Sequence, residues 1–181
     1  MAKEAPVSGI TATPKTPVPM HGAKRWNYLS REKTIRLATT DADGSIYLSP
    51  LWFVVDNKRI FIPIDAAGKH GINGESGRPL AALVDSGEDF ATVRGVRIVG
   101  KMTVVKDAAL KERIKSLLFE KYFGVGDPFA DSYFEMGDAR DRKFYELVPD
   151  KIVGWDAREI AIPPAPEARV LPEFVKDRLV R

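Results

Sequence analysis

Short runs of hydrophobic residues, separated by turn-forming residues, fill the middle of the chain. This pattern is typical of antiparallel β-structure. It predicts a first strand over Arg36–Thr40, a second over Ser45–Val55 and a third over Arg59–Ile64. Asp41–Gly44 and Asp56–Lys58 have the composition of tight turns, so these three strands should form a meander.

The second predicted strand is apolar on both faces. One face carries Ile46, Leu48, Trp52 and Val54, and the other carries Tyr47, Ser49, Leu51, Phe53 and Val55. Such a strand should be buried on both sides. Pro50 cannot donate a ladder hydrogen bond and belongs at an edge or a bulge. Beside Trp52 it either leaves backbone groups open to a planar ring or simply kinks the strand, and the pattern leaves both readings open.

Three further strands are predicted downstream. They cover Leu80–Asp85, Val93–Val105, and a last strand made of Lys143–Val148 and Ile152–Trp155, broken at Pro149-Asp150. Gly95 and Gly100 interrupt the long strand, as glycines do where a barrel strand bends. The sequence therefore predicts a mainly β fold, a six-stranded antiparallel split barrel, and strand spacing favours a closed barrel over an open sheet.

One amphipathic helix should follow Asp107, which is a good N-cap, and end before Gly124. Its apolar stripe consists of Leu110, Ile114, Leu117, Leu118 and Tyr122 and is expected to be core. Ser30 is a candidate N-cap of a short helix before the first strand. Gly126–Arg140 is rich in aromatic residues and is predicted to be a loop or broken helix. It could be a flap over a pocket, a subunit contact or plain packing.

The two ends of the chain differ from its middle. Residues 1–24 carry several prolines among small polar residues and are expected to form an arm, disordered or laid on a surface. Residues 157–181 are also proline-rich and should form an extended tail. The folded domain is expected over residues 25–156, with packing beginning at Trp26 and Tyr28.

Composition excludes several classes of function. The 181 residues suffice for one domain, and a net charge of +3 from dispersed basic residues argues against nucleic-acid binding. The chain has no cysteine and two histidines, which excludes thiol chemistry and a multi-histidine metal site. Neither a signal peptide nor a long apolar run is evident, so we expect a cytoplasmic protein with no membrane contact.

The candidate chemistry lies after the third strand. Ala66-Ala67-Gly68 lets the backbone approach a ligand closely, and Lys69 brings a positive charge there, as a phosphate would require. A single helical turn should carry Lys69, His70 and Asn73. An ordinary solvated lysine is the alternative interpretation of Lys69, and His70 is expected to be exposed and structural rather than an acid or base.

The run RLATTDADGSIYLSPLWFVVDNKRIFIPIDAAGK resembles the flavin-binding split-barrel superfamily typified by pyridoxamine 5'-phosphate oxidase. RGVRIVGKMTVVKD and FYELVPDKIVGWD resemble the remaining strands of that barrel, so the likeness extends from Tyr28 to Asp156. In that family two chains pair and a flavin lies in each groove between them. The resemblance therefore implies a homodimer that binds FMN or the deazaflavin coenzyme F-420.

The resemblance also assigns site residues by position. It implies that the flavin ring is lined by Ser49, Pro50, Leu51 and Trp52 on one strand and by Ile62, Pro63 and Ile64 on the next. Lys69 and Asn73 would hold the phosphate, and Trp155 would reach the flavin from the partner chain. Asn73 is followed by Gly74 rather than the leucine common in the family. The arginines that bind pyridoxal phosphate in the true oxidases have no clear counterpart in the final strand.

The resulting expectation is an FMN-dependent oxidoreductase that passes a hydride to or from a small organic substrate, and not a true pyridoxamine phosphate oxidase. The cofactor carries the chemistry, so no protein side chain is assigned as a catalytic acid or base, and no metal is expected. The alternatives are a reductase that uses coenzyme F-420, or a non-catalytic flavin- or haem-binding protein of the same fold.

Overall fold

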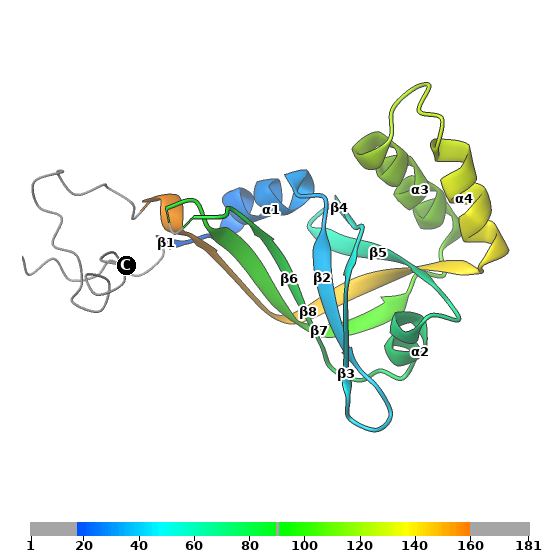
Figure 1. Ribbon diagram of the computed structural model, residues 1–181, viewed down its shortest axis with the longest axis horizontal. Coiled ribbons are helices and arrows are strands. Elements are labelled where there is room, and N and C mark those ends of the chain that lie inside the picture. The colour runs from blue at the N-terminus through cyan, green and yellow to red at the C-terminus, as the bar shows by residue number, and fades with distance from the viewer. Residues whose placement is uncertain (1–17, 90, 160–181) are drawn as a thin grey trace, which may run out of the picture.

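The computed structural model describes residues 18–89 and 91–159, which fold around one curled antiparallel sheet (Figure 1). Its strands are β1 (Val18–Pro19), β2 (Ile35–Thr40), β3 (Ile46–Leu51), β4 (Val54–Asp56), β5 (Arg59–Asp65), β6 (Leu80–Ser86), β7 (Arg94–Val104) and β8 (Arg142–Asp156). The helices are α1 (Gly22–Arg31), α2 (Lys69–Glu75), α3 (Ala108–Tyr122) and α4 (Ala130–Ala139), followed by the 3-10 turn η1 (Ala157–Glu159). No helix in the described part of the chain is long and apolar enough to cross a membrane.

The sheet follows the order β3-β2-β6-β7-β8-β5-β4, and β1 pairs with the end of β8. β3 and β4, at the two ends of this path, are joined directly through Trp52 and Phe53, so the sheet curls back on itself. The expected split barrel is confirmed, with eight strands in place of six. The second predicted strand is divided in two and β1 is added. Within the described residues, no backbone hydrogen-bond ladder joins β3 to β4. The barrel is therefore open at this point, and not closed as expected.

The meander forms with the predicted turns. The amide of Asp41 donates to the carbonyl of Ser45 at 2.8 Å, and Gly44 takes the left-handed φ of 87° that this turn requires. Asn57 and Lys58, at φ 48° and 62°, form the second turn. Turn chemistry in the sequence therefore placed both corners correctly.

The prediction of one second strand, buried on both faces, was wrong. The chain leaves the sheet at Trp52-Phe53, and on β3 the side chains of Ile46 and Leu48 are 74% and 61% exposed. The cause is topological, because β3 is an edge strand whose outer face nothing in the described chain covers. Pro50 lies in this edge strand, as expected for a residue that has no backbone N–H to donate.

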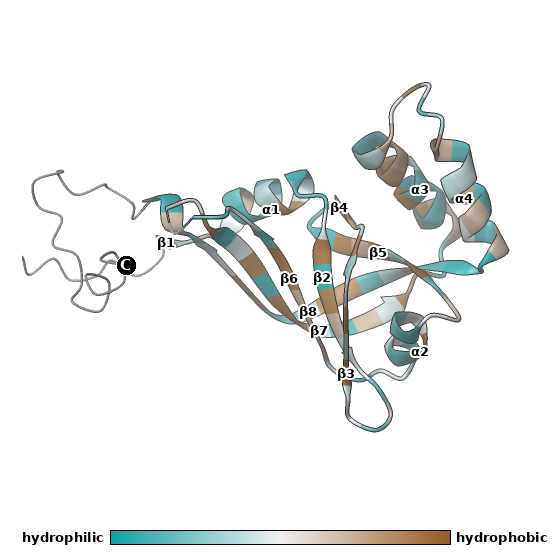
Figure 2. Cartoon of the chain, viewed as in Figure 1, coloured by the Kyte–Doolittle hydropathy of each residue, from teal (hydrophilic) through white to brown (hydrophobic). Residues whose placement is uncertain are grey.

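Two hydrophobic cores stabilise the molecule. The larger fills the inside of the curled sheet, and hydrophobic and polar residues alternate along β2 and β6 around it (Figure 2). Leu29 of α1 and Met20 before it are both almost fully buried in this core. The smaller core lies between α3 and the sheet and consists of Val54, Phe61, Val105, Ile114, Leu118 and Phe144.

β8 is continuous through the predicted break. Gly100 pairs with Pro149 and Val99 with Lys151, so Asp150 is an extra residue in a bulge. A Cβ on Gly100 would lie 2.1 Å from a backbone oxygen of β8, which explains why the bend needs glycine. Pro149-Asp150, which suggested a break, therefore marks a bulge.

The helices are partly as predicted. α3 begins after Asp107, whose carboxylate accepts from the amide of Leu110 at 2.7 Å, and it ends before Gly124. Gly126–Arg140 was predicted to be a loop or broken helix; it contains a regular helix, α4, over Ala130–Ala139. Ser30 does not cap a helix that follows. It lies in the last turn of α1 and donates to the carbonyl of Trp26.

The chain also folds earlier than expected. Val18–Pro19 pairs with the end of β8, and α1 begins at Gly22. The folded part thus includes Val18, within the arm expected over residues 1–24. η1 occupies the start of the tail expected over 157–181, while residues 1–17 and 160–181 lie outside the described part of the chain.

Candidate functional site

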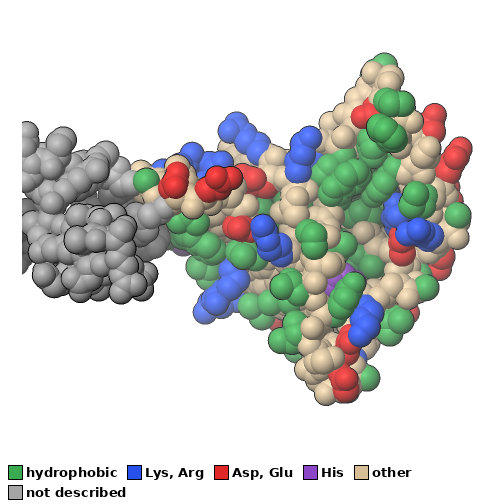
Figure 3. Space-filling view, in the orientation of Figure 1, with side chains coloured by type: hydrophobic (Ala, Val, Ile, Leu, Met, Phe, Trp, Pro, Cys, Tyr) green, Lys and Arg blue, Asp and Glu red, His purple; other side chains and the backbone are tan. Residues whose placement is uncertain are grey.

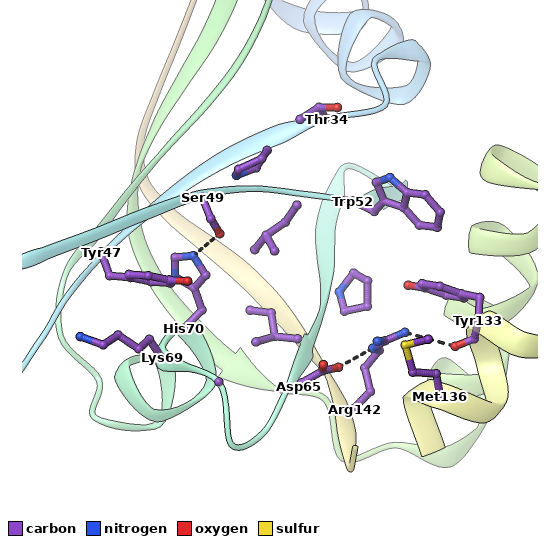
Figure 4. Close-up of a pocket in the computed structure, with 15 residues that line it drawn as sticks. Thr34, Tyr47, Ser49, Trp52, Asp65, Lys69, His70, Tyr133, Met136 and Arg142 are labelled. Atoms are coloured by element: carbon purple, nitrogen blue, oxygen red, sulfur yellow. Dashed lines mark hydrogen bonds and ion pairs between the residues drawn. The ribbon is translucent and has the colours of Figure 1, made fainter. Parts of the chain in front are cut away.

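A cavity of about 750 Å³ lies between β3, the end of β5, α2 and α4 (Figure 4). In the space-filling view, hydrophobic side chains gather in the hollow between the sheet and the α3–α4 pair, with basic side chains at its margins (Figure 3). The lining residues are Thr34, Tyr47, Ser49, Pro50, Leu51, Trp52, Pro63, Ile64, Asp65, Gly68, Lys69, His70, Tyr133, Met136 and Arg142. An apolar cavity with a few polar groups at its edge is the usual form of a cofactor site.

Most of the residues suggested by position meet around this cavity. Those that line it are Ser49, Pro50, Leu51, Trp52, Pro63, Ile64 and Lys69. Ile62 does not, because it lies mid-strand and is fully buried in the larger core. Asn73 lines an adjoining hollow together with Asp41 and Lys69. Trp155 pairs with Gly95 near the β1 end of β8 and does not line the cavity.

Sequence reasoning missed several lining residues. Tyr133 and Met136 come from α4, the segment whose aromatic content had suggested a flap among other roles. Asp65 and Arg142 are far apart in the sequence and meet only because β5 and β8 pair in that register. No signal in the sequence reveals such a register, whereas the aromatic content of α4 was visible.

Lys69 lies at one side of the cavity, and its amine forms an ion pair with Asp41 of the β2–β3 turn (Figure 4). This hydrogen bond raises the pKa of Lys69, so the ammonium is charged at neutral pH. Hydrogen bonds from Asn73 and Lys69 lower the pKa of Asp41. An anionic ligand would therefore meet a lysine that already has a carboxylate partner.

His70 was expected to be exposed, and this was wrong. Its side chain is 4% exposed and lies under the ring of Tyr47, at 4.8 Å between ring centroids. Its Nδ1 is 2.9 Å from the hydroxyl of Thr39 and its Nε2 is 2.9 Å from that of Ser49. Burial lowers the pKa of His70, so the imidazole is neutral at pH 7.

Trp52 is held in place by the end of α3. The ring of Tyr122 stacks on it at 4.3 Å, with 9° between the planes. The Tyr122 hydroxyl accepts from the amide of Phe53 at 2.8 Å and lies 2.7 and 2.8 Å from the carbonyls of Phe53 and Lys33. Lys121 donates to the same Phe53 carbonyl, and burial lowers the pKa of Lys121 to about 8. The corner between β3 and β4 is thus fixed from outside the sheet.

Tyr122→Phe should therefore destabilise the protein by about 1–3 kcal/mol, because it leaves the Phe53 amide without its partner. Chemical denaturation would measure this loss. Tyr47→Phe is the control, since its hydroxyl makes no hydrogen bond with the described residues, and it should change stability by less than about 0.5 kcal/mol. Equal losses in the two variants would show that the hydroxyl does not hold the corner.

On the wall of the cavity opposite Trp52, Arg142 links α4 to the end of β5 through hydrogen bonds (Figure 4). Its Nε donates to Asp65 at 2.7 Å, its Nη1 donates to the carbonyl of Tyr133 at 3.3 Å, and the guanidinium lies 4.6 Å from the centre of the Tyr133 ring. Within the described ranges, no group of three or more acidic or histidine side chains could hold a metal ion. The site therefore offers apolar walls and hydrogen-bonding edges.

The family model for pyridoxamine 5'-phosphate oxidase matches residues 26–156. The chain belongs to this family. The match covers the whole sheet apart from β1, and so includes β3, β5 and α2, which form the cavity.

Solved structures share the fold. A conserved hypothetical protein from Mycobacterium tuberculosis superposes with a TM-score of 0.70 at 22% identity, over 88% of this chain and 98% of that one. The haem storage protein HutZ from Vibrio cholerae gives 0.59 at 18% identity, over 73% and 94%. A FAD-binding protein from Mesorhizobium loti gives 0.57 at 15% identity, over 75% and 93%. No curated protein sequence matches this chain.

Proposed function

We propose that this protein is an FMN-dependent oxidoreductase that transfers a hydride to or from a small organic substrate in the cytoplasm. The observation that carries the proposal is the cavity itself, which joins an apolar wall to a charged lysine on a family fold known for flavin binding. Bound flavin supplies the hydride chemistry, and the protein needs to bind it, orient it and exclude water.

The residues present fit such a cofactor. Pro50, Leu51, Pro63 and Ile64 form an apolar centre on which a planar ring system can lie. Trp52 and Lys69 stand at opposite sides of this centre (Figure 4). An aromatic system with one phosphate tail matches this division, with the tail toward Lys69. None of the lining side chains is required as an acid or base.

The proposed active form is a homodimer. Next to the cavity, β3 exposes Ile46 and Leu48, an unusual state for large aliphatic side chains in an edge strand. A second copy covering this face would bury both and bring further residues to the cavity. Trp155 would reach the partner's flavin, and Asn73, whose amide donates to Asp41 and Thr39, would support the phosphate end through Asp41 rather than by direct contact. Sedimentation equilibrium should give twice the monomer mass.

Two alternatives differ in what is bound. A deazaflavin has the same ring shape and an anionic tail, so the cavity walls suit it as well as FMN. The likeness to a haem storage protein suggests a second alternative, in which the protein binds haem without turnover. Against haem, both nitrogens of His70 already have hydrogen-bond partners, so this histidine is not free to ligate iron. This favours the flavin.

Visible spectroscopy with redox cycling tests the proposal. The purified protein, titrated with FMN, should show a flavin spectrum that is bleached anaerobically by NADH or NADPH and restored by a quinone or nitroaromatic acceptor. Parallel titrations with coenzyme F-420 and haem distinguish the alternatives. FMN that binds but never cycles with any donor and acceptor pair would refute the enzyme and leave a binding protein.

A further inference from the structure

A chain of five polar side chains runs from the β2–β3 turn to the cavity. Asn73 donates from its amide nitrogen to Asp41 at 2.6 Å and to the Thr39 hydroxyl at 3.1 Å. Thr39 contacts Nδ1 of His70, and Nε2 of His70 contacts Ser49, both at 2.9 Å. The three middle members are 3–5% exposed, so each donor and acceptor needs a partner inside the protein. Ser49 and His70 are the two of these five residues that line the main cavity.

The direction of these hydrogen bonds follows from the charged end. The carboxylate of Asp41 can only accept, because hydrogen bonds from Asn73 and Lys69 keep its pKa low. Asn73 must therefore turn its NH2 group toward Asp41, and the same nitrogen donates to Thr39. The oxygen of Thr39 is thereby used as an acceptor, and its own proton still needs a partner.

Among the residues that the structure describes, Nδ1 of His70 is the remaining partner of the Thr39 hydroxyl. The hydroxyl donates to Nδ1, which must then carry no proton. A neutral imidazole in this state is protonated at Nε2, and that N–H donates to the oxygen of Ser49. In the opposite tautomer the Thr39 proton would be buried without an acceptor.

We propose that His70 is a positioning residue that commits the Ser49 hydroxyl to donate into the cavity. Since the oxygen of Ser49 accepts from His70, its proton is free to point at a bound ligand. The ligand edge beside Ser49 must then be an acceptor, such as a carbonyl oxygen or an unprotonated ring nitrogen. This inference deepens the proposed flavin site and rests on it for the identity of the ligand.

The surroundings protect this arrangement from water. The ring of Tyr47 covers His70 (Figure 4). The amine of Lys69 lies 5.6 Å from the centre of the same Tyr47 ring. The order of donors is therefore built into the folded protein and does not depend on the ligand. It can be measured in the protein without a cofactor.

Nitrogen-15 NMR of the imidazoles provides the first test. His70 should show one protonated nitrogen at Nε2 and one unprotonated nitrogen at Nδ1 at pH 7, with His21→Gln assigning the two histidines. Thr39→Val should abolish this single-tautomer pattern, while Ser49→Ala should leave it intact, because orientation passes from Thr39 to Ser49. A proton on Nδ1 in the unmodified protein would overturn the proposal, whatever the variants do.

FMN titration of the same variants provides the second test. Ser49→Ala should weaken FMN binding about 2- to 10-fold, the range for one neutral hydrogen bond. Thr39→Val should weaken it similarly, and the double variant should be no weaker than Ser49→Ala alone. Thr40→Val, the next position of β2, is the matched control and should bind FMN normally.

The outcomes separate the two proposals. Additive losses in the double variant, or unchanged affinity in Ser49→Ala, would overturn the role of Ser49 as a donor to the ligand. Failure of the unmodified protein to bind FMN would instead overturn the proposed function, and with it the assignment of the ligand, while the NMR result would still decide the state of His70.

Discussion

Lys69→Ala is expected to weaken FMN binding about tenfold or more, because it removes a charge-assisted hydrogen bond to the phosphate. Lys69 is solvent-exposed and shared with Asp41, so we expect the lower end of the range for such bonds. Fluorescence titration with FMN measures the change. Lys101→Ala, an exposed lysine on β7 away from the cavity, is the matched control and should have no effect.

Riboflavin makes this experiment specific, because it has the same ring system and no phosphate. Lys69→Ala should leave riboflavin affinity unchanged, so the variant and the original protein should differ for FMN alone. Asp41→Asn should act in the opposite direction on FMN, since it removes the carboxylate that competes for the amine. If Lys69→Ala weakens both ligands equally, the lysine supports the shape of the site and does not bind the phosphate.

Leu118→Ala should destabilise the protein by about 2–5 kcal/mol, the cost of a cavity at a fully buried leucine. Leu118 is central to the smaller core, where α3 packs on Val54, Phe61 and Phe144. Urea denaturation followed by circular dichroism measures the loss. Leu117→Ala, one position along and only half-buried, should cost less and is the control.

The Leu118 variant should also affect the cavity, since α3 carries Tyr122 against Trp52. If α3 packs less tightly, Tyr122 holds Trp52 less firmly, so FMN affinity should fall along with stability. Leu117→Ala should retain more of both. Full FMN affinity in a strongly destabilised Leu118→Ala protein would show that α3 stabilises the fold without shaping the site.

Local patterns in the sequence predicted the elements that depend on near neighbours. The turns at Gly44 and Asn57 follow from residues that accept positive φ, and α3 follows from its cap at Asp107 and its apolar spacing. The errors arose where one residue pattern is compatible with two different structures. Apolar alternation continued through Trp52-Phe53, so no local signal revealed that the chain changes strands there.

His70 is an example of a site residue whose burial the sequence alone does not reveal. A histidine in a glycine-rich polar segment gives no sign of burial. His70 is buried because β2 supplies Thr39, and β3 supplies Tyr47 and Ser49, around it. Likewise Asp65 and Arg142 meet only through strand register. The resemblance by position brought seven residues to the cavity and misplaced Ile62, because the cavity borders only the end of β5 and Ile62 lies mid-strand in the larger core.

The sequence by itself determined the mainly β architecture, the two hairpin corners, the long helix and the lysine beside a close turn. These depend on backbone preferences and periodicity over a few residues. Only the tertiary structure decided that Lys69 has a carboxylate partner, that α4 closes one wall and that a buried histidine supports Ser49. Each of these is a contact between segments far apart in the chain, and its energy depends on distances that no local pattern encodes.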